Sequence, residues 1–180
     1  MQSTEVRIGG FGGQGVVLAG VLLGEAALCD GLYAIQNQSY GAEARGGAAR
    51  SEVLLAADPI LYPEVIAPHI LVAMSQAALE RYLPDLRPEG TLIVDTELVA
   101  QVPERPEGRI LGGSFTSVAD KELGRAIVAN MVMLGFVVGC TQVVGAPSLR
   151  QAVAQGVPQG TEELNISALE RGLELATYGA

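Results

Sequence analysis

The sequence has few charged residues for its length. Of the 180 residues 17% are charged and 49% are hydrophobic, and tryptophan is absent. A folded chain with so little charge either lies in a membrane or covers much of its surface with partners. The composition therefore favours a membrane protein or a subunit of an assembly over a free-standing monomer.

Basic residues are scarce as well. The chain has 11 Lys and Arg against 20 Asp and Glu, a net charge of −9, and its one lysine and ten arginines are scattered. Binding to nucleic acid requires a basic face that can contact phosphates. Nucleic acid is therefore excluded as the main partner.

Metal-ligating residues are too few for a cluster. Cys29 and Cys140 are far apart and form no C-x-x-C pair, so the chain alone provides the ligands of neither an iron–sulfur cluster nor a structural zinc. We expect two buried, free thiols, which suit a reducing cytoplasm, and residues 1–5 lack the pattern of a signal peptide. His69, the one histidine, follows a proline and opens an apolar run, which favours packing or capping over catalysis.

One apolar run requires a membrane test. Residues 126–149 carry no charge over 24 positions and contain the close-packing pair Gly135 and Gly139. Asn130 and two further polar residues interrupt the run, and acids precede it where a helix dipole favours them. We therefore expect a buried helix that extends from residue 117 through the run, with no membrane span. Gly20 and Gly24 repeat the pair and predict a second close helix contact.

Buried strands and helices alternate along the chain. Strands are predicted at residues 5–10, 32–36, 49–56, 69–74, 91–94 and 109–111, and helices at 15–30, 76–86, 117 through the apolar run, and 164–176. This order predicts an α/β fold, a single three-layer α/β/α sandwich over residues 1–180 with a Rossmann-like start. Two strands without an intervening helix, between residues 32 and 56, indicate a mixed sheet.

A glycine loop follows the first strand. Its residues Gly10, Gly12, Gly13, Gln14 and Gly15 contain the G-x-G-x-x-G spacing, which places backbone N–H groups and a helix N-terminus where an anion can bind. An NAD site also needs an acid at the end of the second strand, where this chain has Gln36-Asn37-Gln38. Three interpretations stay open: a phosphate site, a contact for a partner's loop, and a tightly packed turn.

A second polar loop follows the second predicted strand. It comprises Ser39, Tyr40, Gly41, Glu43, Arg45, Gly46 and Gly47. Carboxyl ends of parallel strands share one sheet edge, so this loop is expected beside the glycine loop. Recognition loops and ordinary surface loops both have this composition. Ser75 and Asp95 also follow buried strands at that edge, and a helix N-cap explains Ser75 equally well.

The motifs GGFGGQGVVLAGVLLGEAA and QSYGAEARGGAARSEV resemble the gamma subunit, or gamma domain, of 2-oxoacid:ferredoxin oxidoreductases. The segment VAMSQAALERY fits too, and the likeness is closest to the 2-oxoglutarate type, while indolepyruvate oxidoreductase beta subunits are similar over the same motifs. The resemblance implies conversion of a 2-oxoacid and coenzyme A to acyl-CoA, carbon dioxide and reduced ferredoxin. It also implies that thiamine diphosphate and iron–sulfur clusters are carried by partner subunits, with no cofactor bound by this chain alone.

The resemblance further implies thiamine-binding and ferredoxin-like partner subunits, and ferredoxin reached through the complex. The two loops would meet the thiamine-binding subunits, with Arg45 holding a partner loop or an anionic group of substrate or coenzyme A. A simple surface pair between Arg45 and Glu43 is the alternative, and a homodimer is open for the isolated chain. A self-sufficient nucleotide- or coenzyme A-binding protein is the alternative function.

Overall fold

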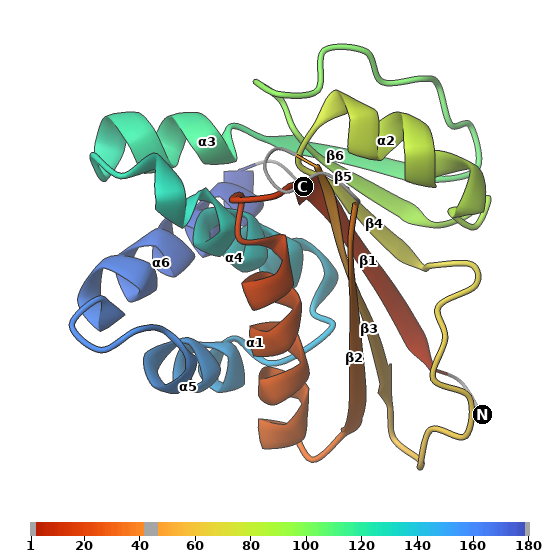
Figure 1. The fold of residues 1–180 in the computed structure, drawn as a ribbon, viewed down its shortest axis with the longest axis horizontal. Coiled ribbons are helices and arrows are strands. Elements are labelled where there is room, and N and C mark those ends of the chain that lie inside the picture. The colour runs from red at the N-terminus through yellow and green to blue at the C-terminus, as the bar shows by residue number, and fades with distance from the viewer. Residues whose placement is uncertain (1–2, 42–46, 179–180) are drawn as a thin grey trace.

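A six-stranded mixed sheet forms the centre of the protein (Figure 1). The computed structural model describes residues 3–41 and 47–178. The strand order is β2-β3-β1-β4-β5-β6. The strands β1, β4, β5 and β6 are parallel, whereas β3 runs antiparallel between β1 and β2. The mixed sheet is therefore confirmed. The strand bounds are β1 (Thr4–Phe11), β2 (Tyr33–Tyr40), β3 (Ala48–Ala56), β4 (Ile70–Ala73), β5 (Thr91–Asp95) and β6 (Arg109–Gly113).

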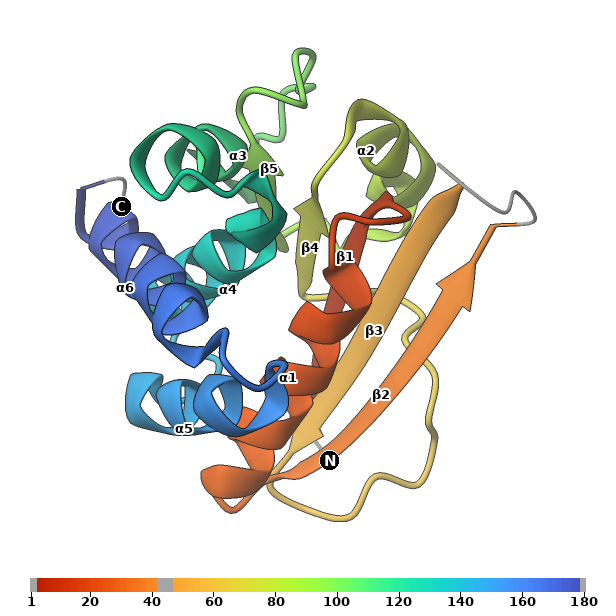
Figure 2. The same cartoon turned by 60° about the vertical axis from the view of Figure 1, so that its left-hand side comes forward.

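Helices cover the two faces of the sheet unequally. Figures 1 and 2 show α1, α4, α5 and α6 on one face and α2 on the other, which confirms the three-layer fold. The helices are α1 (Val16–Cys29), α2 (Gln76–Tyr82), α3 (Phe115–Ser117), α4 (Ala129–Thr141), α5 (Ala146–Gly156) and α6 (Glu162–Tyr178). Short turns of other helical types are η1 (Leu83–Asp85), η2 (Val118–Glu122) and η3 (Ala126–Val128).

Alternating side chains of β1 divide the core into two parts. Val6 and Ile8 are fully buried against the α1 and α4 layer. Arg7 and Gly9 point to the opposite face, where a smaller apolar cluster forms beneath α2. Because successive strand residues face opposite sides of a sheet, one short segment positions both layers.

The apolar run forms α4, whose buried residues extend from Ala129 to Val138. The expected continuous helix from residue 117 is wrong, because Gly124 adopts a left-handed φ of 68° and separates η2 from η3. The helix ends at Thr141, before Gln142 at φ 52°. Within residues 3–41 and 47–178, none of the helices has the length and apolar character needed to cross a membrane.

Helix α5 was missed by the sequence analysis, which assigned its start to the apolar run. Pro147 lies in its first turn, where proline is favoured and signals a helix start. Leu149, Ala152 and Val153 are buried at helical spacing. Asp30, after the end of α1, accepts hydrogen bonds from the Gly145 N–H (2.6 Å) and from the Ser148 hydroxyl, so α1 positions α5.

The two glycine pairs pack against different partners. Gly135 lies against α6, where an added Cβ would be 3.0 Å from the Leu173 nitrogen and 3.1 Å from the Gly172 Cα. A Cβ on Gly20 would instead meet the Ser51 side chain of β3, with 2.9 Å to its Cβ. The expected helix contact is therefore confirmed for Gly135, whereas Gly20 faces the sheet.

The cysteines differ from expectation. Cys29 is exposed, because it occupies the last turn of α1 beyond the core, and Cys140 is half-buried; both are free. Burial raises the pKa of the Cys140 thiol, and Arg109 acts in the opposite direction. The argument from two buried thiols is wrong for Cys29.

His69 has the packing role expected of it. Its Nδ1 accepts a hydrogen bond from the backbone N–H of Glu5 (3.0 Å), which requires an unprotonated Nδ1. Burial lowers the pKa of His69, and Arg87 lowers it further, while Glu5 and Glu89 raise it less. The ring therefore joins β1 to β4 in its neutral form.

This contact predicts a pH effect on stability. In the unfolded chain the histidine pKa is about 6.5, whereas in the folded chain it is lower, so the unfolded chain takes up the proton first as the pH falls. The contribution of His69 to the free energy of unfolding is therefore complete above about pH 6.5. It is lost as the pH falls toward the lowered folded pKa. We expect His69→Asn, which keeps an acceptor, to lose less stability between pH 7.5 and 5 than the unchanged protein in denaturant titrations. Identical losses would contradict the assignment.

Candidate functional site

The carboxyl ends of β1 and β2 bring the two predicted loops together. The Gly12 N–H donates a 2.8 Å hydrogen bond to the carbonyl of Gly47, and the Gly41 N–H donates to Ala48 (2.6 Å). Because β2 runs in the same direction as β1, both connections lie at one edge. The expected contact is confirmed for Gly12 and Gly47, while Glu43, Arg45 and Gly46 lie outside the described residues.

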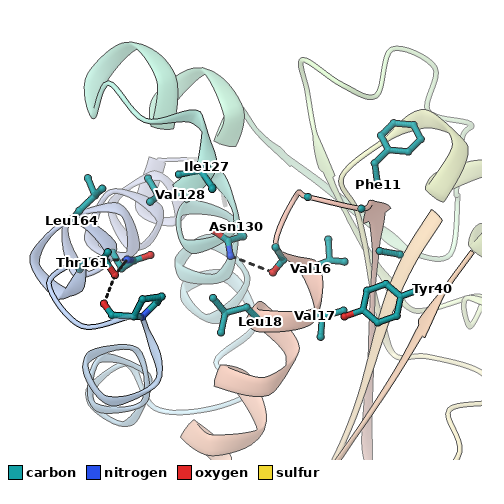
Figure 3. Close-up of a pocket in the computed structure, with 16 residues that line it drawn as sticks. Phe11, Val16, Val17, Leu18, Tyr40, Ile127, Val128, Asn130, Thr161 and Leu164 are labelled. Atoms are coloured by element: carbon teal, nitrogen blue, oxygen red, sulfur yellow. Dashed lines mark hydrogen bonds between the residues drawn. The ribbon is translucent and has the colours of Figure 1, made fainter. Parts of the chain in front are cut away.

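The second predicted strand is longer than expected. β2 continues to Tyr40, so Ser39 and Tyr40 belong to the strand and not to a loop. Pairing along the whole of β3 extends it, because each residue from Tyr33 to Tyr40 opposes one from Ala56 to Ala49. Tyr40 is 63% exposed and extends beside the glycine loop (Figure 3).

Gln14 closes the glycine loop with its own side chain. Its Oε1 accepts from the Phe11 N–H (2.6 Å), and its Nε2 donates to the carbonyl of Met74 (2.8 Å), at the end of β4. The Gln14 N–H donates to the carbonyl of Phe11 (3.1 Å). Together with the Gly12 bond, these contacts engage the N–H groups of Phe11, Gly12 and Gln14 within the chain.

The backbone geometry requires glycine at three positions of this loop. Gly13 and Gly15 adopt φ of 100° and 71°, which side chains rarely tolerate. A Cβ on Gly10 would lie 2.5 Å from Oε1 of Gln14. The G-x-G-x-x-G spacing therefore produces a tight turn around Gln14.

Gln36, Asn37 and Gln38, which occupy the place of a ribose-binding acid in the sequence, lie inside β2. Gln36 donates to the Ser51 hydroxyl (2.9 Å), and Asn37 donates to the carbonyl of Pro63 (2.5 Å). Tyr33–Tyr40 contains no acid. The described part of the site thus lacks the carboxylate that a dinucleotide site uses.

An apolar groove of about 390 Å³ opens beside the glycine loop (Figure 3). It lies between the start of α1, the start of α4 and the connection from α5 to α6. Phe11 is 43% exposed and Ile127 is 74% exposed at its borders. A second hollow, of about 360 Å³, shares Gly13 and Ile127 with it. None of the described residues lining either hollow is charged.

Few polar groups reach the groove. Asn130, which is buried, donates from Nδ2 to the carbonyl of Gly15 (3.2 Å) and so joins α4 to the glycine loop. Asn165 donates to the Thr161 carbonyl (2.8 Å) on the opposite wall. Among the described side chains, none caps α1, and its first turn has no acid. In the sequence Asn130 interrupts an apolar run, and a lone amide in such a run is the one signal that points to this role.

Ser75 and Asp95 have structural roles. The Ser75 hydroxyl accepts from the Ala78 N–H (3.2 Å) as the N-cap of α2, which was one of the two interpretations left open. The fully buried Asp95 carboxylate accepts from the Thr116 hydroxyl (2.7 Å), the Thr116 N–H and the Glu97 N–H. Neither pairs with a base in the described residues, so neither forms a nucleophile site.

Comparison with known proteins assigns the family. The family model for pyruvate ferredoxin/flavodoxin oxidoreductase matches residues 5–175. The chain belongs to this family. Within it, the 2-oxoglutarate synthase subunit KorC of Methanothermobacter marburgensis is 50% identical over 97% of both chains. KorC of Methanocaldococcus jannaschii is 46% identical over 96% of this chain and 93% of that subunit.

Solved structures of similar proteins have the same fold. The keto/oxoacid ferredoxin oxidoreductase gamma subunit of Geobacter sulfurreducens is 40% identical, with a TM-score of 0.86, and the match covers 97% of this chain and 99% of that one. The 2-oxoglutarate:ferredoxin oxidoreductase of Magnetococcus marinus contains the fold within a longer chain, with a TM-score of 0.87 at 20% identity and 32% of that chain covered. This family member therefore has a fold found both as a separate subunit and as part of a longer chain.

Proposed function

We propose that this family member is the gamma subunit of a cytoplasmic 2-oxoglutarate:ferredoxin oxidoreductase. The assembly would convert 2-oxoglutarate and coenzyme A to succinyl-CoA, carbon dioxide and reduced ferredoxin. Near full-length identity of 46–50% to 2-oxoglutarate synthase subunits supports the substrate. The alternative as an indolepyruvate oxidoreductase subunit has no comparable support among these relatives.

In this proposal the chain holds neither the thiamine diphosphate nor the clusters. A thiolate-bound iron–sulfur cluster needs four ligands, and the two cysteines lie on different helices. Thiamine diphosphate is a pyrophosphate, which in proteins is commonly held through a divalent cation and its oxygen ligands. Across residues 3–41 and 47–178, no group of three or more His, Cys, Asp or Glu side chains could hold a metal ion. Two cysteines cannot supply the four ligands of a cluster, so we assign the clusters to other subunits. The family resemblance supports the same assignment for thiamine diphosphate.

The observation that carries the proposed role is the closed glycine loop beside an uncharged groove. Gln14 occupies the loop, and Phe11 and Ile127 remain exposed around it. Interface cores are depleted of charge and enriched in aromatic side chains. The groove is therefore suited to a loop or helix of a thiamine-binding subunit. A self-sufficient nucleotide-binding protein is less well supported, because contacts within the chain engage the N–H groups of Phe11, Gly12 and Gln14 and the described part of the site lacks a ribose-binding acid.

Arg45 and Glu43 belong to this proposal through their place in the sequence. The residue that follows their segment, Gly47, is bonded to Gly12 of the glycine loop. Arginine holds carboxylates and phosphates through two parallel hydrogen bonds. We assign Arg45 to a partner loop or to an anionic group of 2-oxoglutarate or coenzyme A.

The test uses the complete assembly and the isolated chain. The isolated chain is expected to reduce no viologen dye with 2-oxoglutarate, coenzyme A and thiamine diphosphate, while added partner subunits restore turnover. Ile127→Asp is expected to weaken assembly at least about tenfold, and Arg45→Ala to lower either assembly or rate as much, roughly 1.4 kcal/mol. Both isolated variants should keep the melting temperature of the unchanged chain.

Leu28→Asp is the matched control, because Leu28 is 59% exposed on α1 near its carboxyl end, away from the groove. It should assemble normally. Turnover by the isolated chain would contradict the assignment of the catalytic cofactors to other subunits. Normal assembly of Ile127→Asp would remove the groove from the interface, and a fully active Arg45→Ala assembly would make its loop a surface connection.

A further inference from the structure

A strap formed by residues 58–68 connects β3 to β4 on the sheet face opposite α1 (Figures 1 and 2). Three of its side chains are apolar or aromatic and strongly exposed: Leu61 at 79%, Tyr62 at 57% and Ile66 at 68%. The groove described above lies on the other face, beside α1 and α4. The strap is therefore a separate apolar surface, which the proposed function leaves without a role.

The strap is held at alternate residues by side chains from β2, from β1 and from the turn before β5. The Pro63 carbonyl accepts from Asn37 (2.5 Å), the Val65 carbonyl from Nη2 of Arg7 (3.1 Å), and the Ala67 carbonyl from Nε of Arg87 (2.6 Å). The Ala67 N–H also donates to Glu5 (3.2 Å).

These bonds turn the intervening side chains outward. Val65 is 7% exposed, whereas its neighbours Glu64 and Ile66 are exposed. Tyr62 donates its hydroxyl to Glu64 (2.8 Å), which fixes the ring and the carboxylate relative to each other. A pre-ordered set of anchors loses little conformational freedom when it binds.

The charge of this surface selects the partner. Residues 58–68 carry two acids, Asp58 and Glu64, and no base, and the adjacent edge strand β2 carries no charge. Of the arginines that contact the strap, Arg7 is buried and Arg87 is paired with Glu5. Nucleic acid and anionic lipid would be repelled. A second copy meeting strap to strap would bring like charges together.

We propose that the strap docks a second, different subunit of the assembly, one with an apolar hollow bordered by lysine or arginine. This inference rests on the proposed function, because that assembly supplies the partner. The chain would then be a bridge between two subunits, with one bound at the groove and the other bound at the strap. Leu61, Tyr62 and Ile66 would fill the hollow, and Asp58 and Glu64 would face the basic border.

The experiment purifies the complete assembly through a tag on this chain and identifies its subunits by native mass spectrometry. Leu61→Ser/Ile66→Asp is expected to lose one subunit, with affinity lowered at least tenfold, and to retain the subunit held at the groove. Glu64→Lys should weaken the same contact, and Glu64→Gln should reduce its salt dependence. Leu28→Asp should retain every subunit, and the isolated variants should melt normally because the altered side chains are exposed.

The outcomes separate this inference from the proposed function. Loss of the same subunit from Ile127→Asp and from the strap variant would overturn the two-surface arrangement. Retention of every subunit at unchanged affinity by the strap variant would overturn the inference even if Ile127→Asp dissociates. A strap-dependent dimer of the isolated chain in sedimentation would make a second copy the occupant and would also overturn it. If Ile127→Asp keeps every subunit while the strap variant loses one, the groove interface is contradicted and the strap inference stands.

Discussion

Arg7→Met is expected to lower the free energy of unfolding by about 3–5 kcal/mol, because it leaves a buried carboxylate without its partner. Arg7 is 3% exposed and Glu52 is 7% exposed, and Nε of Arg7 lies 2.7 Å from Oε1 of Glu52. Arg7 also pairs with Asp85 and lies over the Tyr82 ring, 5.4 Å from its centroid. Arg50, 3.4 Å from Glu52, compensates only in part because it is more exposed.

Denaturant titration of the isolated chain measures this loss. Arg7→Met/Glu52→Leu should recover much of it, because the double variant removes the buried charge pair. Arg150→Met is the matched control, since its pair with Glu170 is partly exposed and should contribute less than about 1 kcal/mol. A cost as small for Arg7→Met as for the control would show that Glu52 finds another partner.

Gly135→Ala is expected to cost about 2–3 kcal/mol, despite the better helix propensity of alanine, because the new methyl group collides with the backbone of α6. The nearest backbone atoms in that helix include the Leu173 nitrogen at 3.0 Å. A methyl on Gly172 would in turn meet α4, at 2.8 Å from the Phe136 nitrogen. The two helices therefore approach with backbone against backbone, and neither can yield without moving the other.

Gly24→Ala is the matched control in another buried helix. A methyl group there would have its nearest neighbour at 3.9 Å, an ordinary contact, so we expect stability to rise by about 0.5–1 kcal/mol. Thermal unfolding should show a fall of about 5–10 °C for Gly135→Ala and a small rise for Gly24→Ala. Equal effects at the two positions would contradict backbone crowding as the cause.

The sequence alone was sufficient for features that depend on local pattern. The strand into the glycine loop, the helix α1, and the buried strands β4 and β5 follow from apolar runs and from glycine at left-handed positions. The packing role of His69 was also expected from its position, and the N-cap at Ser75 was one of two interpretations that the sequence left open. The family resemblance came from two motifs and was confirmed by the family match over residues 5–175.

The sequence pattern predicted three features wrongly: the end of β2, the continuity of the helix into α4, and the burial of Cys29. β2 extends through polar residues to Tyr40 because β3 pairs with its whole length, and no propensity in Gln36 to Ser39 predicts that. The run into α4 breaks at Gly124, and Cys29 is exposed because α1 extends past the core. For β2, tertiary pairing outweighs intrinsic preference, whereas the break before α4 follows from the left-handed backbone of Gly124 itself.

Some features of the candidate site follow from the sequence alone, and others depend on the tertiary structure. The sequence determined the glycine spacing and the absence of a ribose-binding acid in Gln36 to Gln38, because both are matters of residue type at fixed positions. Only the tertiary structure placed Gln14 inside its own loop, brought Asn130 and Asn165 to opposite walls of one groove, and turned Leu61 and Ile66 outward on the strap. These arrangements depend on contacts between residues up to 115 positions apart, such as that of Asn130 with Gly15, which chain folding creates and local residue pattern does not encode.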